Sequence, residues 1–145
     1  MQKITPFLWF DNNLEEAINF YSTVFKNAKI SSINPMSATF ELEGQQFMAL
    51  NGGPHFKFNE AVSFFVNVET QEEVDYYWNK LTADGGAESR CGWLKDKFGL
   101  SWQIIPSILG KLMGDKDPVK AKKVIDAMLT MNKIDVKGLQ EAYES

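Results

Sequence analysis

Residues 51–60 read Asn51-Gly52-Gly53-Pro54-His55-Phe56-Lys57-Phe58-Asn59-Glu60, and residues 91–103 read Cys91-Gly92-Trp93-Leu94-Lys95-Asp96-Lys97-Phe98-Gly99-Leu100-Ser101-Trp102-Gln103. The first stretch is a loop pattern with a Gly-Pro step, and the apolar run after it predicts a strand over 61–68. The second stretch predicts strands over 88–94 and 100–106, separated by an Asp-Lys-Phe-Gly turn. The elements around these two stretches repeat along the chain.

Residues 16–21 match residues 72–77 without a gap, so the two segments are offset by 56 residues. Each predicts a helix after an apolar strand, with a capping box at Asn13 and Glu16 in the first and at Thr70 and Glu73 in the second. The first strand is predicted over 4–10, and shorter strands follow over 29–34, 38–43 and 46–51, the last two joined by a hairpin turn at 43–45. The pattern predicts an α+β fold of two tandem βαβββ modules.

The chain changes character after Pro106, where Gly110 and Gly114 break the pattern. Asp117-Pro118 is a strong helix start, and Asp135 is expected to cap a last short helix that ends near Tyr143. This helical tail, residues 107–145, is predicted to fold back on the sheets or to pack on a partner chain. We expect one domain over 1–145, with module one at 1–54 and module two at 58–106.

Composition excludes several classes of function. The net charge of -4 and the pI near 5.0 argue against a nucleic-acid surface, which would be basic. The apolar runs are too short to span a bilayer. Cys91 is the single cysteine, so it cannot form an internal disulfide or a CxxC metal site. We therefore expect a cytoplasmic protein that binds neither nucleic acid nor membrane.

The tandem βαβββ pattern, with the helix-opening segment 13–21, resembles the vicinal oxygen chelate superfamily, which contains glyoxalase I, bleomycin-resistance proteins and extradiol dioxygenases. The segments 50–54, 58–61 and 91–96 resemble its PhnB-like branch, often labelled 3-demethylubiquinone-9 3-methyltransferase. The resemblance is taken to cover essentially the whole chain, including the tail. It implies two curved mixed sheets around a cleft, with a C-terminal helical extension.

The methyltransferase label does not fit the glycine pattern. The common class of such enzymes holds its cofactor at a glycine-rich loop between a parallel strand and a helix. Neither of the paired glycines, Gly52-Gly53 and Gly85-Gly86, both follows a strand and opens a helix in that way. We therefore discount methyl transfer and predict no cofactor.

In catalytic members, the resemblance implies four His, Gln or Glu metal ligands from four strands. The matching positions here are Pro6 or Phe7, Ala49, Ser63 and Gln103. Pro, Phe and Ala have no side-chain donor, and serine is a poor ligand for a divalent ion. We predict no metal site, with a non-standard cluster of Glu60, Glu88 and Asp96 as the alternative. The single histidine, His55, is predicted to be a solvated loop residue.

Strand alternation predicts which residues face the cleft. One face is expected to carry Phe47, Ala49 and Asn51 in module one, and Ser63, Phe65, Asn67, Ser101, Gln103 and Ile105 in module two. Such a lining, apolar with a few amides and hydroxyls, is typical of a small-molecule site. The predicted ligand-binding residues are Asn51, Ser63, Phe65, Gln103, Trp9, Trp93 and Trp102.

The resulting prediction is a metal-independent binder of a small, partly aromatic or apolar molecule. One alternative is a metal-dependent lyase or dioxygenase-type enzyme with non-standard ligands. Another is an interaction protein whose apolar tail, with Met113, Met128 and Met131, pairs two subunits. A homodimer is expected in any case, because the resemblance implies clefts completed across two chains.

Overall fold

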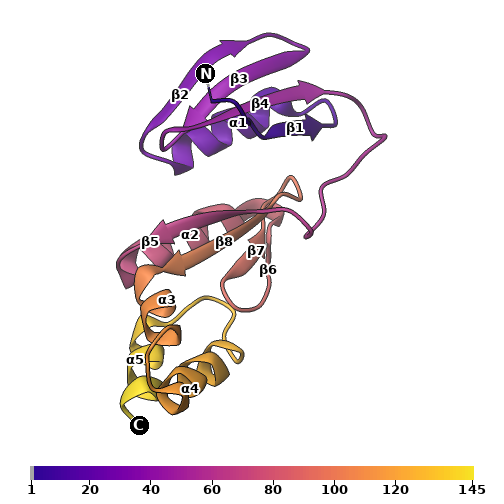
Figure 1. Cartoon of the computed structure of the whole chain (residues 1–145). Coiled ribbons are helices and arrows are strands. Elements are labelled where there is room, and N and C mark those ends of the chain that lie inside the picture. Colours follow the sequence, from indigo (N-terminus) through magenta and orange to yellow (C-terminus); the bar gives the residue numbers. More distant parts are fainter. Residues whose placement is uncertain (1) are drawn as a thin grey trace. The chain divides into compact units, whose positions relative to one another are not determined.

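The computed structural model describes residues 2–145, which form two compact units that divide between residues 58 and 59. Each unit carries one βαβββ repeat, and the second also carries the tail helices (Figure 1). The sheets have the orders β1-β4-β3-β2 and β5-β8-β7-β6, which are equivalent position by position. This shared topology confirms the predicted α+β fold and the internal duplication.

Unit 1 is a four-stranded sheet covered on one face by a helix. Its elements are β1 (Phe7–Phe10), α1 (Leu14–Val24), β2 (Ala28–Ile33), β3 (Ser37–Leu42) and β4 (Gln45–Asn51). β1 pairs with β4 in parallel, and the other pairs are antiparallel. The apolar stripe of α1 is buried with alternate strand residues, among them Leu14, Ile18, Tyr21, Leu8, Phe10, Phe40, Phe47 and Ala49. Burial of each large side chain contributes about 2 kcal/mol, so this layer stabilises the unit.

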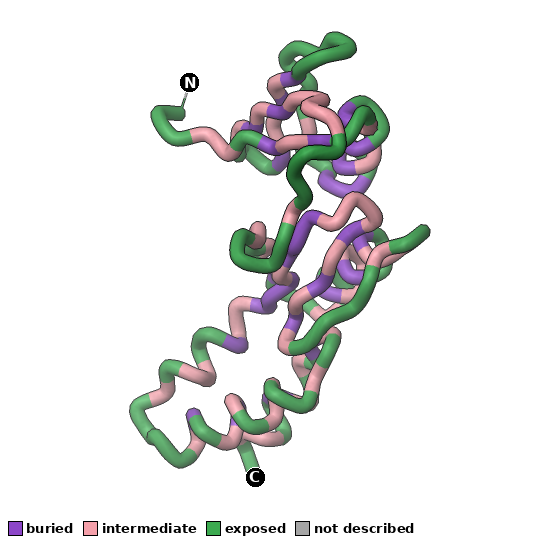
Figure 2. Tube along the Cα trace, turned by 90° about the vertical axis from the view of Figure 1, so that its right-hand side faces the viewer, coloured by how far each residue is buried: buried purple, intermediate pink, exposed green. Residues whose placement is uncertain are grey.

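Unit 2 repeats this arrangement. Its elements are β5 (Ser63–Val68), α2 (Gln71–Thr82), a short 3-10 turn (Ala83–Gly85), β6 (Ala87–Glu88), β7 (Trp93–Lys95) and β8 (Ser101–Pro106). β5 and β8 are parallel, whereas β6, β7 and β8 pair antiparallel. Helix α2 is buried along Val74, Trp78 and Leu81, and the sheet contributes Val68, Leu94, Trp102 and Ile104. Buried residues alternate along β3, whereas five of the six residues of β8 are buried, and Figure 2 shows the burial along the whole trace.

The strand predicted over 88–94 is wrong, because a turn divides it into β6 and β7. Cys91 and Gly92, in the turn between them, have φ values of 59° and 86°. A Cβ at Gly92 would lie 2.6 Å from Ile105 Cδ1, so the chain approaches β8 closely at this point.

The helix caps differ from one repeat to the other. Thr70 caps α2 as predicted, accepting a 3.2 Å hydrogen bond from Glu73 N–H, while the Glu73 carboxylate accepts one from Glu69 N–H. The side chain of Asn13, predicted to cap α1, makes no capping bond. Instead, Asn51 Oδ1 at the end of β4 accepts a 3.0 Å hydrogen bond from Leu14 N–H. The cap of α1 therefore comes from a distant strand.

The tail forms three helices, α3 (Ser107–Met113), α4 (Pro118–Met128) and α5 (Val136–Glu144). The predicted start of α4 is confirmed, since Asp117 Oδ1 accepts from Val119 N–H at 2.9 Å. The predicted break at Gly110 is wrong, because α3 continues through it. The tail folds back on its own unit around a core of Ile105, Leu109, Val124, Ile134 and Leu139, against which Met113, Met128 and Met131 pack.

No helix within residues 2–145 combines the length and apolar character needed to cross a membrane.

Candidate functional site

The sheet of unit 2 has an open face, opposite to the face covered by α2. Strand pairing aligns Ser63, Ser101, Lys95 and Ala87 in one row across the four strands. The next row contains Phe65, Gln103 and Trp93. Because side chains alternate between faces, both rows project to the same side. The structure thus brings together four of the predicted ligand-binding residues: Ser63, Phe65, Gln103 and Trp93.

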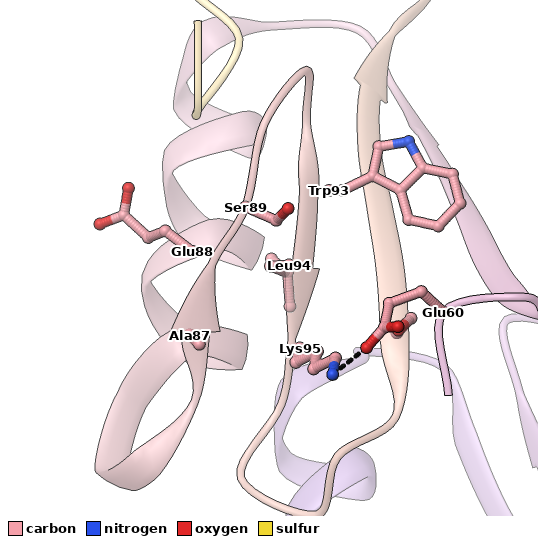
Figure 3. Close-up of a pocket in the computed structure, with 8 residues that line it drawn as sticks. Glu60, Ala87, Glu88, Ser89, Trp93, Leu94 and Lys95 are labelled. Atoms are coloured by element: carbon pink, nitrogen blue, oxygen red, sulfur yellow. Dashed lines mark ion pairs between the residues drawn. The ribbon is translucent and has the colours of Figure 1, made fainter. Parts of the chain in front are cut away.

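A pocket of about 310 Å³ lies on this open face at the β6–β7 side (Figure 3). It is lined by Glu60, Ala87, Glu88, Ser89, Trp93, Leu94, Lys95 and Ser101. Figure 3 shows the Lys95 and Glu60 side chains meeting below the Trp93 ring, while the Glu88 carboxylate extends away from both. The volume suits a molecule of about the size of a substituted benzene ring, at the lower end of the usual range for ligand pockets.

Ser101 is the most unusual residue of this pocket. It is 1% exposed, and its Oγ has no hydrogen-bond partner among the described residues. A buried hydroxyl without a partner costs about 1–3 kcal/mol relative to one that is satisfied. Neighbouring atoms cover this hydroxyl in the wall of the pocket, so a ligand would reach it only if those atoms moved.

Lys95 and Glu60 form an ion pair at the edge of the pocket. The hydrogen bond from Lys95 is the main cause that lowers the pKa of the Glu60 carboxyl, and its own backbone N–H adds to this. The two side chains are 41% and 61% exposed, so solvent screens their attraction and the pair adds little stability. Its effect on the pocket is to neutralise the one cation there.

Gln103 and Ser63 lie beside the pocket and bind each other. Gln103 Nε2 donates a 2.9 Å hydrogen bond to Ser63 Oγ, which fixes the orientation of the amide. Phe65, two residues after Ser63 on the same face of β5, is 59% exposed. These three residues extend the pocket into a shallow surface with one amide, one hydroxyl and one aromatic ring.

Trp102 is not brought together with these residues. It lies on the α2 side of the sheet and is 3% exposed, with its ring 5.5 Å from that of Phe64. Its indole Nε1 donates to Asp96 Oδ2 at 2.9 Å. Asp96 Oδ1 accepts from Phe98 N–H and Leu100 N–H, which holds the 96–99 turn together.

Unit 1 holds the two remaining predicted residues, Trp9 and Asn51. Trp9 Nε1 donates to Gly53 O at 2.9 Å, and its ring makes an edge contact with Phe56. A Cβ at Gly52 would lie 2.3 Å from the Trp9 ring, so only glycine fits there. Asn51 lines a polar pocket of about 260 Å³ at the start of α1. Its Nδ2 donates to Pro35 O, and its Oδ1 accepts the cap bond from Leu14.

The predicted open face of β4 is wrong by one residue. Phe47 and Ala49 are buried on the α1 side, so the open face carries Met48 and Leu50 instead. In the duplicated topology Leu50, not Ala49, corresponds to Gln103, because Leu50 pairs with Trp9 as Gln103 pairs with Phe65. The buried apolar residues of β4 resemble a pocket lining, so the strand pattern alone predicts that the wrong set of alternate residues faces the cleft.

Strand alternation placed Ser101 on the cleft face, and Glu60 was named only as a possible metal ligand. Ser89 and Lys95 were not predicted to line the site. Lys95 lies two residues after Trp93, so alternation could have found it. Glu60 and Ser89 lie outside regular strands and carry no such signal.

Comparison with known proteins identifies the family. The family model described as 3-demethylubiquinone-9 3-methyltransferase matches residues 2–105. The chain belongs to this family. The match and the fold are consistent with the resemblance to the vicinal oxygen chelate superfamily. No curated protein matches the chain.

Solved structures agree with this assignment. A putative 3-demethylubiquinone-9 3-methyltransferase, PhnB protein, from Bacillus cereus is 38% identical, with a TM-score of 0.67, over 73% of this chain and 100% of that one. A glyoxalase-related enzyme from Fulvimarina pelagi is 19% identical, with a TM-score of 0.56, over 75% and 91%. The fosfomycin resistance protein FosX from Listeria monocytogenes, solved with Mn(II) and sulfate, is 13% identical, with a TM-score of 0.56, over 73% and 90%. The last two show the fold alone.

The resemblance does not extend to the tail, contrary to expectation, since the family match ends at residue 105. The methyltransferase in the description is a family name only. In the structure Gly52-Gly53 leads into a loop and Gly85-Gly86 leads into β6, so neither pair opens a helix.

The residues at the superfamily's metal positions do not fit a divalent ion. In unit 1, Phe7 and either Ala49 or Leu50 offer no donor atom. In unit 2, Ser63 and Gln103 are hydrogen-bonded to each other. The alternative cluster does not form either: both oxygens of Asp96 accept bonds from its own turn and from Trp102. Among residues 2–145, no three His, Cys, Asp or Glu side chains are grouped to hold a metal ion. His55 is exposed in its loop, as predicted.

Proposed function

We propose that this PhnB-like protein binds a small, uncharged, partly aromatic molecule in the unit 2 pocket, without a metal at the superfamily's ligand positions. The observation that carries the proposal is the buried Ser101 Oγ, which has no hydrogen-bond partner among the described residues and belongs to the wall of the pocket that Trp93 also lines. A ligand that reached this hydroxyl would supply the missing hydrogen bond.

The chemistry of the pocket selects the ligand class. Trp93 offers an aromatic surface, and Leu94 and Ala87 add apolar contact. The Lys95 ammonium is already neutralised by Glu60, so an anionic ligand would compete with an existing ion pair. An uncharged aromatic molecule with one hydroxyl or carbonyl group satisfies Ser101 without that competition.

The other predicted residues keep distinct places in this proposal. Ser63, Phe65 and Gln103 form the surface next to the pocket, where a substituent on the ligand would lie. Trp102 supports the sheet from its opposite face. Trp9 and Asn51 belong to unit 1, and a ligand-binding role for them stays a prediction.

The test is a titration of the full-length protein with 4-fluorophenol, an uncharged phenol whose ¹⁹F resonance reports binding. Saturable binding that is weakened by both Ser101→Ala and Trp93→Ala, but not by Ser32→Ala on an exposed strand of unit 1, supports the proposal. If 4-fluorophenol, 4-fluoroacetophenone and fluorobenzene all fail to bind, or if Ser101→Ala leaves their affinity unchanged, the proposal is wrong.

We also propose that the protein is a cytoplasmic homodimer. Large apolar side chains on the open faces, Phe7 in unit 1 and Phe65 in unit 2, are exposed to solvent, as is Val62 just before β5. Exposed apolar residues of this size mark interaction surfaces when they gather on one face. Light scattering after size exclusion gives the mass directly, and a monomer at micromolar concentration would refute the homodimer.

A further inference from the structure

The turn between β6 and β7 is held by the tail. Cys91 N–H donates to Met131 O at 2.8 Å, and Gly92 N–H donates to Asn132 O at 2.8 Å. Arg90 Nη2 adds a 3.2 Å hydrogen bond to Leu129 O. Three hydrogen-bond donors of this turn thus bind backbone carbonyl oxygens of one tail segment, residues 129–132.

This turn has a conformation that needs external support. Cys91 and Gly92 both lie in the left-handed region, with φ values of 59° and 86°. A non-glycine residue there is strained, and it persists only where its surroundings determine the backbone. The tail holds the backbone of this turn in place through the two backbone hydrogen bonds and through Ile134, which packs against Gly92 and is fully buried.

The same turn is flanked by two walls of the pocket. Ser89 N–H donates to Trp93 O at 2.9 Å, which closes the turn, and both residues line the pocket. On the sheet side, Gly92 O accepts from Ile104 N–H at 2.8 Å. The backbone from 89 to 93 therefore has the tail on one side and the pocket on the other.

We propose that the C-terminal helices are a positioning element for the pocket. Docking of residues 129–134 fixes the left-handed turn, and the turn sets the direction in which Trp93 and Ser89 enter the pocket. The family match ends at residue 105, so this device lies in a segment that the family model does not include. The effect on ligand affinity rests on the function proposed above, but the positioning itself does not.

Gln71 offers a way to loosen the tail without touching the pocket. It lies in the first turn of α2, and its Nε2 donates to Ile134 O at 3.0 Å. Its Oε1 accepts from Val136 N–H at 2.7 Å, so one amide binds both ends of the 134–136 link. Asn79, an exposed amide on the same helix, is a matched control.

The experiment compares ¹⁵N-labelled full-length wild type, Gln71→Ala, Ile134→Ala and Asn79→Ala by NMR without ligand. In the two tail variants, the Cys91 and Gly92 amides should exchange about tenfold faster or more, since hydrogen bonds and packing that hold their acceptors are lost. The Trp93 indole resonance, assigned with Trp93→Phe, and the Ser89 amide should shift. Asn79→Ala should match wild type, and 4-fluorophenol affinity should fall several-fold only in the tail variants.

The proposal is overturned if the two amides exchange faster while Trp93 and Ser89 keep their wild-type resonances, because the tail would then add stability without positioning the pocket. It is also overturned if neither variant changes the exchange of Cys91 and Gly92. A wild-type protein that binds no probe refutes the proposed function, whereas the ligand-free resonances still decide the positioning role.

Discussion

The indole Nε1 of Trp102 donates a 2.9 Å hydrogen bond to Oδ2 of Asp96, and both residues are almost completely buried. The other carboxylate oxygen of Asp96 accepts from two backbone N–H groups of the 96–100 segment. One carboxylate thus joins the β7–β8 turn to the layer between the sheet and α2. The Asp-Lys-Phe-Gly stretch of the family signature serves the fold through this carboxylate.

Replacing Asp96 should therefore destabilise the protein strongly. Asp96→Asn places an amide N–H₂ against either the Trp102 indole N–H or the backbone donors, and we expect a loss of about 1–3 kcal/mol. Asp96→Ala removes the acceptor of three hydrogen bonds and should cost about 3–5 kcal/mol. Urea unfolding measures both, and Asp126→Asn, which removes one partner of an exposed ion pair, is the control expected near zero. Equal stability of Asp96→Ala and wild type would contradict the structural role.

Ser101→Ala should change stability and binding in opposite directions. Removing an unpartnered buried hydroxyl relieves a cost of about 1 kcal/mol, so the free protein should unfold at equal or higher urea concentration. The same change removes the hydrogen bond proposed for the ligand, so 4-fluorophenol should bind several-fold more weakly. A variant that loses stability and affinity together would show that Ser101 serves packing only.

Two glycine substitutions should have opposite signs. In Gly52→Ala the new methyl group would overlap the Trp9 ring, and we expect a loss of about 1–3 kcal/mol. Gly110→Ala lies within helix α3 with nothing within 4 Å of the new Cβ, so it should stabilise by about 0.5–1 kcal/mol. Thermal unfolding of both variants is the measurement. Equal effects at the two positions would mean that the close approach of Trp9 to Gly52 is absent in solution.

Attachment of the last helix should depend on pH at both extremes. The Tyr143 hydroxyl donates to Asp115 Oδ2 at 2.7 Å. The Asp117 backbone N–H, and then Tyr143, hold the pKa of Asp115 below its ordinary value of 3.8. The ionised Asp115 carboxylate therefore contributes to stability above pH 3.8, and this contribution is lost as the pH falls through the lowered pKa. Asp115 in turn raises the pKa of Tyr143 above 10.0, so its contribution is present below 10.0 and is lost as the pH rises through the raised pKa.

The measurement is the difference in unfolding free energy between wild type and Tyr143→Phe. The difference should be constant from about pH 5 to 9 and should shrink towards zero beyond either limit. Phenylalanine keeps the ring that Lys120 contacts, so the comparison isolates the hydroxyl. A difference that does not change at pH 3 or pH 11 would contradict the assignment.

Protein purified without chelators should contain far less than one equivalent of Mn, Fe, Ni or Zn. The positions that would hold such an ion offer only Gln103 and Ser63 as donors, and these bind each other. Elemental analysis gives the content, and EDTA should leave the melting temperature unchanged. A stoichiometric metal that resists dialysis would favour the alternative of an enzyme with non-standard ligands.

Local patterns were sufficient for much of the fold. The Thr70 capping box, the Asp117-Pro118 helix start and the hairpin at 43–45 lie within a few residues of α2, α4 and the β3–β4 pair, so the sequence alone located these elements. The sequence also located α1, although the predicted capping box at Asn13 does not form. The break at Cys91 and Gly92 was missed because it depends on Ile105 and on the tail. The continuation of α3 through Gly110 was missed because glycine was weighed without its surroundings.

The site was harder to predict because it depends on the phase of alternation. Ser63, Phe65 and Gln103 were placed on one face correctly, since the polar residues among them fix the phase of β5 and β8. On β4 every residue from Phe47 to Leu50 is apolar, so the pattern has no phase, and only packing against α1 decides that Ala49 is inside. Trp102 was selected by residue type, although its neighbour Gln103 already assigned it to the opposite face.

The cap that Asn51 provides to Leu14 crosses 37 residues of sequence. An isolated segment 14–24 would be too short to hold a stable helix in water, and it lacks a cap of its own. The first turn of α1 is therefore completed only after β4 has paired beside β1. Helix and sheet in unit 1 should consequently form in a single cooperative step, and a variant that delays β4 should slow the appearance of the helix as well.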